Sequence, residues 1–167
     1  MWGLLLSIPV MLGMLMLQVG IVSRLPLLHG TGDLVLLALI AWAVNHRVKM
    51  AWFWSVVGGL FVTYISALPA FSPLVVYLMV VIICRLMLRR IWQTPILLLF
   101  VMTFAGTILQ HLVYIAVLTL AGTPLDITQS ISQVVFPSVL VNLLLILPVY
   151  SLMNDLANWV YPVELEA

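Results

Sequence analysis

The side chains of this sequence that could do chemistry within its interior are three polar groups in long apolar runs. Gln110 and His111 lie in one run, and Asn142 lies in the next. Lipid cannot satisfy such groups, so we expect them to face other helices or a cavity. They would line a substrate cavity or proton path, or form interhelical hydrogen bonds worth about 1 kcal/mol each or less. The sequence favours the hydrogen bonds.

A proton relay needs a carboxylate inside the apolar segments, and the sequence predicts none there. The five carboxylates are all expected at or beyond segment ends: Asp33, Asp126, Asp155, Glu164 and Glu166. Motifs for nucleophilic, zinc or phosphate chemistry are not found in the sequence. The single cysteine, Cys84, excludes an intrachain disulfide or a cysteine-based metal cluster. We therefore expect no enzyme, no cofactor, no metal site and no nucleic-acid binding.

Composition defines the elements that must position these groups. Of 167 residues, 65% are hydrophobic and 7% are charged, whereas soluble domains carry roughly a quarter charged residues. Long apolar runs without alternation predict an all-α integral membrane protein of one domain rather than a barrel. Six transmembrane helices are expected, at about residues 2–22, 31–45, 51–68, 72–88, 94–121 and 134–152. The second is short for a crossing, and a re-entrant helix is the alternative there.

Basic residues predict how this bundle is oriented. The second and fourth connections hold Arg47, Lys49, Arg85, Arg89 and Arg90, which we call the basic rim. Short basic loops stay in the cytoplasm, so both termini are expected to be cytoplasmic. The rim would set orientation and attract anionic headgroups, or would bind an acidic cytoplasmic protein. All six tryptophans are expected near the cytoplasmic interface: Trp2, Trp42, Trp52, Trp54, Trp92 and Trp159.

Small residues recur every four positions in the third predicted helix, and they predict close helix packing. Those at this spacing are Ala51, Ser55, Gly59, Thr63 and Ala67, and Gly58 widens the space beside them. This face would pack against another helix of the same chain, which is the favoured interpretation. The alternative is a groove that binds the transmembrane helix of a partner.

Several short stretches resemble the MreD family of rod shape-determining membrane proteins. They are Gly32–Leu37, Ala41–Ala43, His46–Arg47, Gly58–Leu60, Phe136–Ser138 with Asn142, and Leu147–Tyr150. The resemblance covers nearly the whole chain, including its length and six-helix layout. The chain departs from the family's pattern in residues 61–66, which hold no carboxylate where the family commonly has one.

The resemblance implies a non-catalytic scaffold of the bacterial cell-wall elongation machinery in the inner membrane. It implies binding to MreC, near MreB, RodA and a penicillin-binding transpeptidase, and a role in maintaining rod cell shape. It also implies a fold similar to the S-components of energy-coupling-factor transporters. Two alternatives therefore stay open: a small-solute-binding transport subunit of the S-component type, and an accessory subunit of another membrane complex.

Overall fold

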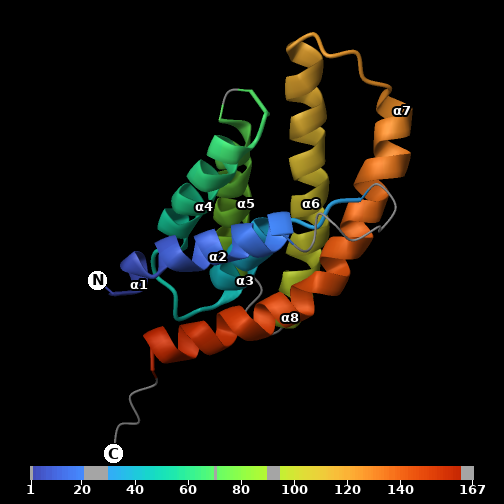
Figure 1. Cartoon of the computed structure of the whole chain (residues 1–167). Helices are drawn as coiled ribbons and strands as arrows, with labels where there is room; N and C mark the ends of the chain where they lie inside the picture. Colours follow the sequence, from blue (N-terminus) through green and yellow to red (C-terminus); the bar gives the residue numbers. More distant parts are fainter. Residues whose placement is uncertain (1, 21–29, 70, 90–94, 163–167) are drawn as a thin grey trace, which may run out of the picture.

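The computed structural model describes residues 2–20, 30–69, 71–89 and 95–162, and every regular element within them is a helix (Figure 1). The all-helical class is thus confirmed. The elements are α1 (Trp2–Leu5), α2 (Ser7–Gly20), α3 (Leu34–Val44), α4 (Ala51–Ile65), α5 (Ser72–Leu88), α6 (Pro95–Leu120), α7 (Ile127–Ser130), the π-helical turn η2 (Ile131–Val135) and α8 (Phe136–Val160). Helices lie in all six predicted segments, and the last extends further than expected.

Three stretches of helix are long and apolar enough to cross a membrane: Gly3–Gly20, Pro95–Leu120 and Ile127–Val160. They support a membrane protein by length and composition. Helices α3, α4 and α5 are apolar but shorter, at 11, 15 and 17 residues. Six crossings and two cytoplasmic termini therefore stay predictions.

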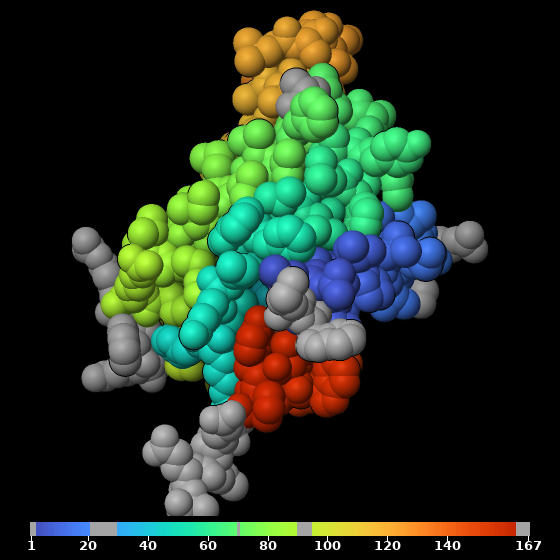
Figure 2. Space-filling view, turned by 90° about the vertical axis from the view of Figure 1, so that its left-hand side faces the viewer, coloured from blue at the N-terminus to red at the C-terminus, as the bar shows by residue number. Residues whose placement is uncertain are grey.

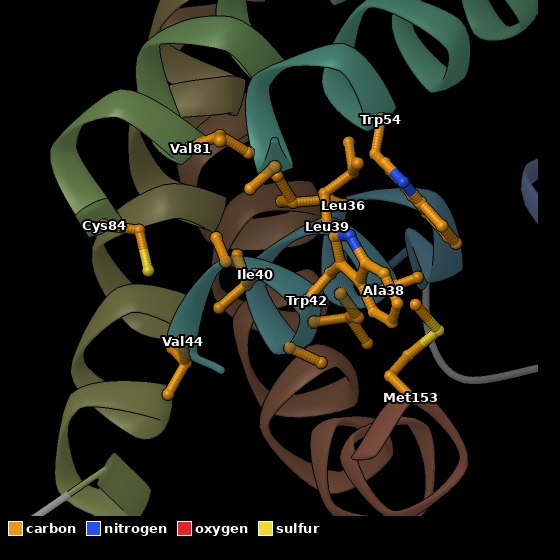
Figure 3. Packing of buried hydrophobic residues seen from close by; sticks show 14 of the residues in the cluster. Leu36, Ala38, Leu39, Ile40, Trp42, Val44, Trp54, Val81, Cys84 and Met153 are labelled. Atoms are coloured by element: carbon orange, nitrogen blue, oxygen red, sulfur yellow. The ribbon is translucent and has the colours of Figure 1, made fainter. Parts of the chain in front are cut away.

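Helix α3 lies at the centre of the bundle, and all 11 of its residues are buried. It contacts α2, α4, α5, α6 and α8. Its sequence permits this position, because a helix that is apolar on every face has no polar side that must meet water. Figure 3 shows Leu36, Leu39 and Ile40 of α3 among side chains from the surrounding helices. At about 1.5 Å per residue, α3 is far shorter than a bilayer core of about 30 Å.

Two tryptophans near helix ends are buried. The Trp42 and Trp54 rings stack inside the core, with centroids 4.1 Å apart, and both side chains are fully buried (Figure 3). Trp42 lies in the last turn of α3 and Trp54 in the first turn of α4, so both stand near helix ends, as expected. Trp52 and Trp159 are exposed, and Trp92 lies outside the described residues. The placement of the tryptophans at the cytoplasmic interface stays a prediction.

The small residues of α4 pack against helices of the same chain. A methyl group at Gly59 would lie 2.7 Å from the Leu74 Cα of α5, and one at Gly58 would lie 3.0 Å from the Val35 side chain of α3. Ala51 and Ser55 are also buried. Internal packing, the favoured interpretation, therefore describes both glycines, and neither is open to a partner helix.

The remaining helices form the outer layer around α3. Helices α4 and α5 make one antiparallel hairpin, while α6 stands beside α8, which curves beneath the bundle (Figure 1). Pro148 lies inside α8, and a proline inside a helix removes a hydrogen bond and permits such a bend. Seen from the side, the end of α8 and the first helices lie together below α4, and the segment after α6 projects at the opposite end (Figure 2).

Candidate functional site

Asp33 is the N-cap of α3 and one of several side chains that satisfy the start of this buried helix. The first N–H groups of a helix have no partner within it, and α3 begins where water cannot supply one. Asp33 Oδ1 accepts from the Leu36 N–H at 2.9 Å. Gln18 Oε1 of α2 accepts from the Val35 N–H at 3.2 Å, and Asn142 Oδ1 of α8 accepts from the Asp33 N–H at 3.0 Å. Three elements thus meet at this terminus.

The second oxygen of Asp33 joins α5 and α6 to the same point. The Tyr77 hydroxyl donates to Asp33 Oδ2 at 2.6 Å, and Gln110 Nε2 donates to it at 2.5 Å. Asn142 Nδ2 in turn donates to Thr107 Oγ1 at 3.0 Å. We call Asp33, Tyr77, Thr107, Gln110 and Asn142 the Asp33 network. All five side chains are buried.

The network adds a buried carboxylate to the predicted polar cluster. Asp33 stands at the end of a helix, as expected, but that helix is short and enclosed, so the carboxylate lies in the interior of the bundle. An aspartate directly before an apolar run indicates a helix N-cap. Composition does not tell whether that helix is buried or faces lipid, since both kinds of helix are apolar. Tyr77 carried no comparable signal, because a single tyrosine in an apolar run is usual.

The predicted polar cluster is brought together only in part. Gln110 and Asn142 both hydrogen-bond to Asp33, through its side chain and its backbone respectively. His111 follows Gln110 on α6, but its Nδ1 lies 2.8 Å from the Thr107 carbonyl oxygen rather than bonding to Gln110 or Asn142. Ser138 of α8 adds a contact nearby, by accepting from the Thr31 N–H at 2.9 Å.

A cavity of about 510 Å³ opens beside this network. Its polar lining includes Gln18, Asp33, Gln110, His111 and Tyr114. The apolar lining comes from α2, α4, α6 and the segment leading into α8: Leu15, Val62, Ile65, Ile115, Leu118 and Val134. Its volume falls in the range of small-molecule sites, and its mixture of apolar walls with a few polar groups is typical of them. The described residues contain no group of three or more His, Cys, Asp or Glu able to hold a metal ion.

The basic rim is divided between an inward and an outward part. Arg85 donates from its guanidinium to the carbonyl oxygens of Ala43 and Asn45, both at 3.2 Å, and to that of Val48. These carbonyls belong to the end of α3 and the turn after it, so Arg85 satisfies that terminus as Asp33 satisfies the other. The sequence assigned Arg85 a peripheral role only, and this inward role was missed.

The other rim residues that the structure describes lie at the surface. Arg47 donates to Asn158 Oδ1 at 2.6 Å, while Lys49 is exposed and Arg90 lies outside the described residues. Arg89 is exposed and, with His46, Arg85 and Leu88, lines a small hollow of about 170 Å³.

The described residues thus form an all-helical bundle with three helices able to span a membrane, built around a buried polar network with an adjoining cavity. In comparisons with known proteins, no family model, no curated protein and no solved structure matches the chain.

Proposed function

We propose that this chain is a non-catalytic membrane adaptor of the bacterial cell-wall elongation machinery, which binds MreC in the inner membrane and helps maintain rod shape. The resemblance to MreD indicates this class of membrane adaptor. The structure supports it by joining two separate stretches of that resemblance, since the Asp33 N–H donates to the Asn142 side chain. Residues from both stretches thus take part in the Asp33 network at the centre of this bundle.

One surface groove carries the adaptor proposal. An apolar hollow of about 480 Å³ lies between α2 and α4, lined by Leu12, Leu15, Leu60, Phe61, Thr63, Tyr64, Ile65 and Phe71. Thr63 Oγ1 is buried and has no hydrogen-bond partner among the described residues. Small and hydroxyl-bearing side chains promote helix association in lipid, through close packing and interhelical hydrogen bonds. Thr63 therefore replaces Gly58 and Gly59 as the small residue best placed to meet a partner helix.

Co-purification with MreC tests this proposal. Tagged chain carrying Thr63→Trp, which fills the groove, is expected to recover several-fold less MreC than the unsubstituted chain. The control is Leu144→Trp, which places the same side chain at an exposed position on α8. Equal recovery of MreC by the two variants would refute the groove as its binding site. Failure of the unsubstituted chain to recover MreC would refute the adaptor, and mass spectrometry of what co-purifies would identify another complex.

A second candidate function is favoured by the cavity beside Asp33. A small-solute-binding membrane subunit needs a cleft with apolar walls and a few polar groups, and the cavity of about 510 Å³ has both. Retention of a small molecule by the purified chain would support it.

A further inference from the structure

One buried acceptor in the cavity lacks a donor. Gln110 is only 4% exposed, and its Nε2 donates to Asp33 Oδ2 at 2.5 Å and to the Tyr114 hydroxyl at 3.3 Å. A carboxylate accepts hydrogen bonds, so Asp33 fixes which end of the Gln110 amide is the donor. Gln110 Oε1 is then left with no hydrogen-bond partner among the described residues. A buried polar atom in this state costs about 1–3 kcal/mol, which a bound donor would remove.

A second acceptor lies next to the first on α6. His111 Nδ1 lies 2.8 Å from the Thr107 carbonyl oxygen, which can only accept, so Nδ1 carries the hydrogen. In the neutral ring, Nε2 is then an acceptor. His111 and Gln110 both line the cavity. Two neighbouring side chains on α6 thus present acceptors among the groups that line this cavity.

The charge of the site favours the same kind of ligand. Asp33 also lines the cavity, and its side-chain partners among the described residues are neutral: the Leu36 N–H, the Tyr77 hydroxyl and the Gln110 amide. A carboxylate in an apolar interior with neutral partners attracts a nearby positive charge.

We infer that the cavity binds an amphipathic small molecule with a ring-sized apolar body and an end that carries N–H donors, as in an amidine, amine or amide. The donor end bonds to Gln110 Oε1, and the body lies against the walls formed by Ile65, Ile115 and Leu118. This inference deepens the second candidate function, on which it rests, and is independent of MreC binding.

Three probes of nearly equal size test the inference. Benzamidine carries cationic N–H donors, benzamide carries neutral ones, and benzoate carries acceptors only. Equilibrium dialysis against the full chain in nanodiscs, corrected with empty nanodiscs, measures the retention of each probe. Binding is expected in the order benzamidine, benzamide, benzoate, with about tenfold between benzamide and benzoate, the value of one hydrogen bond to a buried acceptor.

Three substitutions on α6 test where the probes bind and what recognises them: one fills the cavity, one is its control, and one removes the acceptor. Ile115→Trp fills the cavity and is expected to abolish retention of benzamidine, whereas Leu112→Trp, at an exposed position on the same helix, should leave retention unchanged. Gln110→Met removes the acceptor at similar volume and should reduce the preference for benzamide over benzoate by about tenfold. This variant tests the inference without filling the site.

The outcomes distinguish a failure of the inferred preference for donors from a failure of the solute-binding function on which it rests. Equal binding of all three probes, lost in Ile115→Trp, would keep a solute-binding cavity but overturn its preference for donors. Binding of none of them by the unsubstituted chain would overturn both. A preference that Gln110→Met leaves intact would overturn the assignment of Gln110 as the recognising group.

Discussion

At the scale of the residue, Asp33 is the only buried carboxylate among the described residues, and its two oxygens accept three hydrogen bonds. Asp33 caps α3 through Oδ1 and accepts from α5 and α6 through Oδ2. Hydrogen bonds to a charged group are stronger than those between neutral groups, particularly in an apolar interior. One side chain thus joins three helices, which explains how an acidic residue is tolerated in so apolar a core.

Comparing Asp33→Ala with the same substitution at a second N-cap residue measures how much the network contributes to stability. Asp126 is also an N-cap, since it accepts from the Gln129 N–H at 3.0 Å, but it is exposed at the start of α7. Asp126→Ala is expected to cost about 1 kcal/mol or less. Asp33→Ala additionally removes the carboxylate oxygen that accepts from Tyr77 and Gln110, and should cost at least about 2 kcal/mol more. Unfolding in detergent by SDS titration measures both free energies, and equal costs would contradict the network's contribution.

At the scale of the element, the short central helix depends on side chains from its neighbours at both ends. Water or lipid headgroups normally hydrogen-bond the free N–H and carbonyl groups of a helix terminus, but α3 is enclosed. Asp33, Gln18 and Asn142 act at its start, and Arg85 acts at its end. This division of labour explains why both Asp33 and Arg85 lie inward although each stands at the end of an apolar segment.

Alanine substitutions at two glycines of the outer helices distinguish the effect of close helix packing from that of helix propensity. A Cβ at Gly59 would lie 2.7 Å from Leu74 Cα, whereas nothing lies within 4 Å of a Cβ built at Gly13 on α2. Gly59→Ala must therefore push α4 from α5 and should destabilise the bundle by about 1–3 kcal/mol. Gly13→Ala should be neutral or stabilise by up to about 1 kcal/mol. The same SDS titration compares them, and a harmless Gly59→Ala would contradict the close approach.

The sequence predicted which segments form helices, but not which helices contact one another. Apolar runs bounded by Pro69, Pro95 and the basic turns located every long helix, because lipid-facing and buried helices are both apolar. That same composition hides which helix is central. The stacking of Trp42 on Trp54 and the inward turn of Arg85 depend on contacts between distant segments. Of the site, Gln110, His111 and Asn142 were found as polar exceptions, whereas Asp33 was excluded by its position and Tyr77 was not singled out.

At the scale of the whole molecule, the adaptor and the cavity both depend on how the bundle lies in the bilayer. The basic rim predicts that the α3–α4 turn lies on the cytoplasmic side and the α6–α7 turn on the opposite side. The cavity lining comes from the C-terminal parts of α4 and α6 and the start of the final helical stretch. In this orientation the cavity lies toward the outer side of the membrane, where a solute would enter it.

Cysteine labelling tests that orientation with little background, because the chain's single cysteine, Cys84, is fully buried. Lys49 and Thr123 are exposed in the two turns, so a cysteine at either position is available to a reagent on its own side. In intact spheroplasts, a membrane-impermeant maleimide should label Thr123→Cys, and should label Lys49→Cys only after permeabilisation. Labelling of Lys49→Cys from outside would invert the bundle and turn the cavity toward the cytoplasm. Labelling of both positions from the same side would mean that an even number of crossings separates the two turns, which six crossings do not allow.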